Sequence, residues 1–373
     1  MFKLIPIVLY GLIMSFVIVQ RDRELSFRRG KSVKEKQFTV LLILGLGIFT
    51  GLRVFGNDTA TYIRLYNYGT PILSDFIREF NVSFTDAIGF SFINSLLKTL
   101  GASSQDFIMV YGLATMILYV TFLHHYSESF PFSMYLFFFF GGFLFAQAAI
   151  KQSMAMAISC WSFHFAVKQD WKKFIITVAI SSLFHPFAVI YFLMPFMTFR
   201  PWTGMSYLWI VGSILIGLSL DSLLGAVVDI TALMGASYGS DEFSGEGVNI
   251  FRVLVCLVPT VFSYLFRKKI YCTDDKATYL MMNLTMLNGL IMFVGLFGTA
   301  NYFARLANFF IPFQLIALPW IINRIGQNNR KVVYPIALIG YLMFCMYENV
   351  ILRPFDAGFE QISLWEYLKG LFV

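Results

Sequence analysis

Long runs of uncharged, apolar residues recur from one end of the sequence to the other. Several of them approach the ~17–25 residues that an α-helix needs to cross the hydrocarbon core of a bilayer. The apolar fraction is 58% and the charged fraction only 13%, whereas a soluble domain carries about 25% charged residues. The runs are continuous and not alternating, which excludes a transmembrane barrel. We therefore expect an all-α polytopic integral membrane protein without a soluble domain.

The apolar runs predict about twelve transmembrane helices, some of them short or broken. Their approximate bounds are 2–19, 38–55, 104–123, 132–149, 153–167, two short helices within 174–199, 203–220, 250–266, 278–297, 306–322 and 332–349. The run 174–199 could instead be one long helix kinked at Pro186, because the residue before a proline avoids helical geometry. The balance of basic residues in the later loops favours two short helices that meet at His185–Pro186.

Basic residues orient the predicted spans, because positively charged loops stay on the cytoplasmic side. The loop "QRDRELSFRRGKSVKEK" carries seven basic residues and is expected inside, whereas residues 221–249 carry none and are expected to form an outer loop. Residues 56–102 are expected as an outer segment along the membrane interface. Residues 1–373 would then form a single membrane domain. The net charge of +7 reflects this loop bias and gives no reason to expect a nucleic-acid partner.

Ionisable residues at the membrane edge are few, and most are expected at one level near the outer ends of different spans. They are Arg53, Asp58, Lys151, His185, Arg252 and Arg305. Ionisable groups at such places usually face a water-filled cavity or a partner. Several cations with one carboxylate predict a site for an anionic headgroup, and arginine suits phosphate because its fork bonds two oxygens at once.

Structural explanations compete with this interpretation. An arginine at a helix end often anchors the helix at the interface, and His185 can serve structure alone. Asp58 can cap the helix that follows it. Alternatively, Gly56 can adopt the left-handed turn that closes a helix, which would direct the carboxylate of Asp58 toward Arg53 or Arg305. We find no metal-ligand spacing and no glycine-rich phosphate loop, so neither a metal nor a cofactor is predicted.

Four segments resemble a known family. "LRVFGNDTATYIRLY" is similar to the R…G-x-D…Y signature of the EpsG-like branch of the Wzy-type polysaccharide polymerases, which make O-antigen, capsule and exopolysaccharide. "AAIKQSMAMAIS" and "LFHPFAVI" resemble its R-Q-x-x-A-x-A and H-P-S-A segments, and "NYFARLANFFIPFQLIALP" resembles its last conserved span. The resemblance covers about residues 40–320. Lys151 replaces the usual arginine, and Phe187 replaces the usual serine.

The resemblance implies a metal-independent glycosyltransferase with a GT-C-like helix arrangement in the bacterial plasma membrane. Such proteins join oligosaccharide repeat units carried on undecaprenyl diphosphate at the outer, periplasm-facing side. The lipid-linked units are both donor and acceptor, no cofactor is used, and membrane lipids, a chain-length regulator and a flippase are the expected partners. Two other functions stay open: an O-antigen-ligase-like transferase with the same donor, and a transporter or flippase of lipid-linked oligosaccharides.

The residues fit this chemistry with the following roles. Asp58 and His185 are the candidate catalytic bases. The candidates for binding the diphosphate and the sugars are Arg53, Lys151, Gln152, Arg252, Tyr302 and Arg305. Fixed cations in a partly dehydrated cleft would stabilise the negative charge that grows on the leaving diphosphate.

Overall fold

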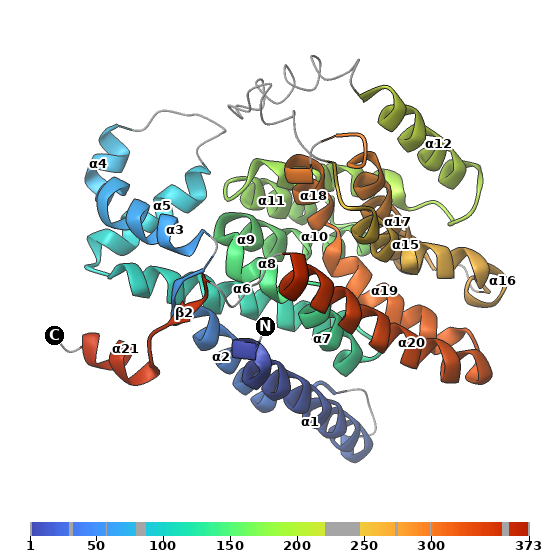
Figure 1. The fold of residues 1–373 in the computed structure, drawn as a ribbon, viewed down its shortest axis with the longest axis horizontal. Coiled ribbons are helices and arrows are strands. Elements are labelled where there is room, and N and C mark those ends of the chain that lie inside the picture. Colours follow the sequence, from blue (N-terminus) through green and yellow to red (C-terminus); the bar gives the residue numbers. More distant parts are fainter. Residues whose placement is uncertain are drawn as a thin grey trace. The chain divides into compact units, whose positions relative to one another are not determined.

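The computed structural model describes residues 2–29, 33–56, 58–79, 87–220, 247–272, 275–298, 300–352 and 358–371, and most of them are helical (Figure 1). The chain divides into two compact units. Unit 1 comprises Met1–Val82, Gly89–Ala157 and Leu338–Val373, and unit 2 comprises Ser83–Ile88 and Ile158–Ala337. Residues 221–246 of the expected outer loop, and residues 57 and 80–86 of the expected outer segment, lie outside the described residues.

Unit 1 holds the first helices of the chain and its C-terminal elements. In chain order these elements are η1 (Phe2–Leu4), α1 (Ile5–Arg29), α2 (Gln37–Gly51), β1 (Arg53–Phe55), α3 (Thr59–Arg64), η2 (Leu65–Gly69), α4 (Leu73–Arg78), α5 (Ile88–Thr99), α6 (Ser104–Tyr126), α7 (Phe130–Phe139), α8 (Gly142–Ala148), α9 (Ile150–Ser159), η4 (Tyr347–Leu352), β2 (Glu360–Gln361) and α21 (Leu364–Gly370). The chain crosses between the units within α5, α9 and α20 (Gln327–Met346).

Glycines allow α2 and α6 to pack closely in unit 1. These two helices lie side by side, and α1 packs on α2 and α7. A Cβ atom added to Gly112 of α6 would lie 3.1 Å from both the carbonyl oxygen of Gly47 and the backbone nitrogen of Gly51. Small residues at such contacts let two membrane helices approach closely. This contact fixes the end of α2, and Arg53 follows two residues later.

Unit 2 is built around α17, which is apolar and buried on nearly every side. Its elements are α10 (Ser162–Val167), α11 (Trp171–Ser182), η3 (Pro186–Met197), α12 (Gly204–Leu218), α15 (Ile250–Leu265), α16 (Arg267–Ile270), α17 (Lys276–Val294), α18 (Ala300–Asn308) and α19 (Ile311–Arg324). The helix α17 packs against α12, α15, α18, α19 and η3. A helix that is apolar all round belongs at the centre of a bundle.

Two of the continuous apolar runs contain a helix break, one at a proline and one at a glycine. The chain is extended at His185, and α11 and the 3-10 helix η3 pack against each other on either side of it, which confirms the predicted pair of short helices. The span expected at 132–149 is instead the pair α7 and α8, bent by 48°. Gly141, between them, has a φ of +100°, which glycine adopts without strain.

Among the described residues, four helices are long and apolar enough to cross a membrane, or six if each bent pair is one span. The four are 5–28, 104–126, 276–294 and 327–352, and the bent pairs are α7 with α8 and residues 302–308 with α19. These helices confirm an all-α membrane protein. The count of about twelve spans stays a prediction.

Candidate functional site

Arg53 is completely enclosed in unit 1, with a relative exposure of 1%. Its Nε donates a hydrogen bond to Oγ1 of Thr59 at 3.1 Å. Its Nη1 donates to the carbonyl oxygen of Thr50 at 3.2 Å and to Oε1 of Gln147 at 3.1 Å. The guanidinium is therefore held by the end of α2, the start of α3 and the end of α8.

The positive charge of Arg53 has no negative partner among the described residues. All three acceptors are neutral, and no described carboxylate lies within ion-pair distance of the guanidinium. Arginine stays protonated in proteins, and a buried charge without a counter-ion costs several kcal/mol. A buried cation of this kind is therefore a candidate for binding an anion.

Arg53 reaches this place by a strand that sequence analysis did not predict. The helix α2 ends at Gly51 and not at residue 55, and β1 pairs antiparallel with β2, with Arg53 opposite Gln361. The amide of Gln105 on α6 also donates to the carbonyl oxygen of Arg53 at 3.2 Å. Arg53 is thus no anchor at a helix end, because backbone pairing fixes its main chain and its side chain turns inward.

Asp58 lies in the N-cap position of α3, but its carboxylate makes no capping hydrogen bond and is exposed. The capping interpretation is therefore wrong. The helix-closing turn expected at Gly56 is also wrong: Gly56 does adopt a left-handed φ of +128°, but it follows β1 and does not close a helix. The approach of the Asp58 carboxylate to Arg53 or Arg305 stays a prediction. The described residues offer this carboxylate neither an ion pair nor a hydrogen bond, so it is open to solvent.

Aromatic rings connect the surroundings of Arg53 with Lys151. Tyr62 lies on α3, which begins at Thr59, a partner of Arg53, and its ring lies 6.0 Å from that of Phe90. The Nζ atom of Lys151 lies over the other ring of this pair, 5.0 Å from the centroid of Phe90. A cation above an aromatic face is stabilised by the ring quadrupole. Unit 1 thus brings together Arg53 and Lys151, and Gln152 follows as a buried residue of α9.

In unit 2, the rings of His185 and Tyr302 both contact the ring of Phe187. The backbone N–H of Phe187 donates to Nδ1 of His185 at 3.3 Å, and the two rings are 4.8 Å apart. The ring of Phe187 also contacts that of Tyr302 at 5.0 Å. The hydrogen bond to Nδ1 leaves Nε2 as the nitrogen that carries the proton in the neutral ring.

A set of buried polar side chains supports the bend between α18 and α19. The carbonyl oxygen of Ala307 accepts from Nδ2 of Asn288 at 2.6 Å, and that of Phe309 accepts from the hydroxyl of Tyr191 at 2.5 Å. Gln314 donates in turn to Oδ1 of Asn288 at 2.5 Å. Carbonyl groups freed by a helix break must be satisfied in this way inside a membrane protein.

Arg305 is placed by this bend on the face of α18 that also carries Tyr302, since residues three apart are neighbours on a helix. Both side chains are partly exposed, whereas Phe303 and Ala307 are buried. Arg252 is a partly exposed residue in the first turn of α15. Unit 2 therefore associates His185 with Tyr302 and Arg305.

The partners of Arg53 were missed in the sequence analysis. Thr50, Thr59 and Gln147 carry no charge and match no motif. The only available signal was that Thr50 and Gln147 are polar residues within predicted spans, where polar groups are costly and usually functional.

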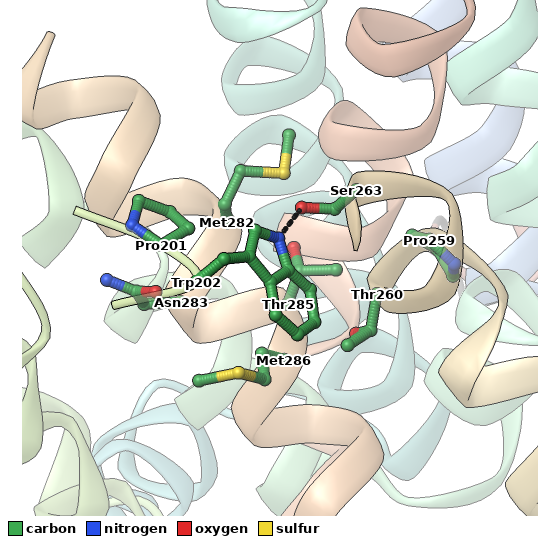
Figure 2. Close-up of a pocket in the computed structure, with 9 residues that line it drawn as sticks. All are labelled: Pro201, Trp202, Pro259, Thr260, Ser263, Met282, Asn283, Thr285 and Met286. Atoms are coloured by element: carbon green, nitrogen blue, oxygen red, sulfur yellow. Dashed lines mark hydrogen bonds between the residues drawn. The ribbon is translucent and has the colours of Figure 1, made fainter. Parts of the chain in front are cut away.

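No group of three or more histidine, cysteine, aspartate or glutamate residues that could hold a metal ion occurs in the part of the chain that the structure describes. A pocket in unit 2 is lined mainly by proline, methionine and the indole of Trp202, whose N–H donates to Oγ of Ser263 at 2.9 Å (Figure 2). Two of its lining oxygens, Oγ1 of Thr260 and Oδ1 of Asn283, are buried without a described partner. None of the predicted site residues lines this pocket.

The fold defines a class: an all-α membrane protein in which some of the apolar helices are interrupted. Residues 36–362 of the sequence match the EpsG family. The chain belongs to this family, whose members are membrane proteins like the Wzy-type polysaccharide polymerases. No curated protein and no solved structure matches the chain. It is thus a membrane protein of the polysaccharide polymerase-like kind. Membership of the family implies an activity of the glycosyltransferase type.

Proposed function

We propose that the protein polymerises oligosaccharide repeat units carried on undecaprenyl diphosphate, at the outer face of the bacterial plasma membrane. The observation that carries this proposal is the fully buried Arg53, whose three acceptors are neutral. A diphosphate is an anion of the kind that would compensate this charge, and arginine binds phosphate oxygens with directed hydrogen bonds. Membership of the EpsG family supports polymerisation. The proposed architecture has about twelve spans in a GT-C-like arrangement.

In the proposed reaction, a hydroxyl oxygen of the acceptor sugar attacks the anomeric carbon of the donor chain. The bond from this carbon to the diphosphate breaks, and its electron pair leaves with undecaprenyl diphosphate. Arg53, Lys151, Arg252 and Arg305 stabilise the charge on that leaving group. Removal of one such contact from an active site typically costs about 2.7–4 kcal/mol, or 10²–10³ in rate.

The hydroxyl proton passes to a base in this scheme. Asp58 is our first candidate, because its carboxylate is exposed and unengaged by the described residues. His185 is the alternative: Nδ1 is the basic nitrogen of its neutral ring, and it would exchange its 3.3 Å hydrogen bond from the Phe187 N–H for the hydroxyl proton. Gln152 and Tyr302 bind sugar or diphosphate oxygens. The charge of the diphosphate is neutralised by side chains, so the reaction is metal-independent.

One observation favours a second candidate function. Two of the apolar segments are bent by 48° and 55° at breaks, and discontinuous helices are typical of transporters. A flippase for lipid-linked oligosaccharides would move its substrate across the membrane without forming a glycosidic bond.

The decisive experiment incubates purified protein in liposomes with one lipid-linked repeat unit. A ladder of products on a gel is the result expected for a polymerase. A single transfer product identifies a ligase, and movement of unreacted lipid across the bilayer identifies a transporter. Either of these outcomes replaces the proposal.

A further inference from the structure

The electrical neutrality of the groups around Arg53 is a structural property in its own right. Surface and buried arginines usually pair with carboxylates, which match the guanidinium fork. Here the acceptors are a hydroxyl, a backbone carbonyl and a primary amide. They satisfy N–H groups of the guanidinium while leaving its full positive charge in place.

Gln147 is the partner whose orientation the structure fixes most completely. It is 2% exposed and lies near the end of α8. Its Nε2 donates to Oγ1 of Thr50 at 2.8 Å, so Oε1 is the atom that faces Arg53. The same threonine accepts from Arg53 through its carbonyl oxygen. Gln147 and Thr50 therefore form a closed, neutral cradle on one side of the guanidinium.

The cradle and Thr59 together engage only some of the N–H groups of the guanidinium. The three hydrogen bonds of Arg53 use Nε once and Nη1 twice, which accounts for three of the five N–H groups of the guanidinium. Nη2 donates to no residue among those described. Its two N–H groups are the ones left to bind a ligand, and the cradle prevents the planar group from rotating away from that direction.

We propose that Gln147 is a positioning residue for an oxyanion of the phosphate class: it aims Nη2 of Arg53 at the ligand while adding no negative charge. This inference rests on the proposed function, because Arg53 is the cation of the proposed site and Gln147 is the residue that holds it in place. A glutamate at this position would keep and strengthen the hydrogen bond from Nη1, with the hydroxyl of Thr50 donating to its second oxygen, but it would cancel the charge that attracts the anion. The identity of residue 147 would thus set the affinity of the site.

The test compares Gln147→Glu with the wild-type protein in detergent, with inorganic pyrophosphate as the probe. Pyrophosphate affinity is measured by calorimetry, folding by thermal unfolding, and turnover by polymer formation from the lipid-linked unit. We expect Gln147→Glu to keep or raise the unfolding temperature, to bind pyrophosphate at least tenfold more weakly and to polymerise at least tenfold more slowly. A purely structural role predicts wild-type affinity and rate, because the variant keeps its bond to Arg53. Wild-type affinity and rate in Gln147→Glu overturn the inference.

A second variant keeps the inference testable if Gln147→Glu does not fold. Gln147→Asn preserves the amide but shortens it by one methylene, so it cannot both reach Nη1 and retain its bond to Thr50. We expect weaker pyrophosphate binding with the charge of the site unchanged, and unchanged binding contradicts the positioning role. If the wild-type protein binds pyrophosphate but forms no polymer, the proposed function fails and the cradle stands. If Gln147→Glu and Gln147→Asn polymerise like the wild type, the cradle fails and the function stands.

Discussion

Replacement of Arg53 by lysine separates the charge of this residue from its geometry. The ammonium of Arg53→Lys is a single centre, so it can occupy the position of Nη1 near Thr50 and Gln147 but not that of Nε at the same time. Oγ1 of Thr59, a residue with 0% exposure, then loses its donor. An unsatisfied buried polar group costs about 1–3 kcal/mol, which is the expected loss of folding free energy.

Activity should fall further than stability in Arg53→Lys, because the directed contact from Nη2 to the diphosphate is lost with the fork. Such contacts are worth about 2.7–4 kcal/mol in a transition state, so polymer formation should slow by about 10²–10³. The assay measures initial rates of polymer formation and unfolding temperatures for the same preparations. Arg64→Lys is the matched control: this exposed arginine of α3 has no described partner, and its change should stay within about 0.5 kcal/mol. Full activity in Arg53→Lys would refute a role for the guanidinium geometry.

Three further predictions concern the other site residues and metals. Lys151→Arg should keep activity and Lys151→Gln should lose at least tenfold in polymerisation rate, since the proposed role of the cation that lies above Phe90 is to stabilise the leaving diphosphate. Equal rates in both variants would make Lys151 an anchor. Asp58→Asn should leave the unfolding temperature unchanged, because the carboxylate caps nothing, and should lose most turnover with pyrophosphate binding intact; normal turnover transfers the role of base to His185. Polymerisation should continue in EDTA, and loss that a divalent ion restores would show that a metal neutralises the diphosphate.

Local sequence patterns were sufficient for the helical class and for one helix break. The apolar runs predicted α6, α17 and α20 because each reaches the ~17–25 residues that a spanning helix requires. The break at His185 followed from the steric effect of Pro186 on the residue before it. The bends after Phe139 and Asn308 were not predicted. At the second bend, the bonds that satisfy the free carbonyls come from Asn288 and Tyr191 on other elements, which no local pattern contains.

The arrangement around Arg53 depended on long-range pairing that no local pattern contains. Arg53 lies opposite Gln361 in the small sheet, and its amide partner Gln147 lies 94 positions away. Sequence analysis identified Arg53 and Lys151 because charge is rare in this chain. It could not identify neutral partners by the same reasoning, since threonine and glutamine occur throughout the spans.

The central claim is that one glycosidic bond forms for each diphosphate that leaves. The most direct measurement counts both products in liposomes that contain the purified protein and a radiolabelled lipid-linked repeat unit. Polymer bonds are counted from the ladder, and released undecaprenyl diphosphate is counted by mass spectrometry. We predict a ratio of one in the wild-type protein, with both products lost together in Arg53→Lys. Polymer without released undecaprenyl diphosphate, or release without polymer, would contradict the account.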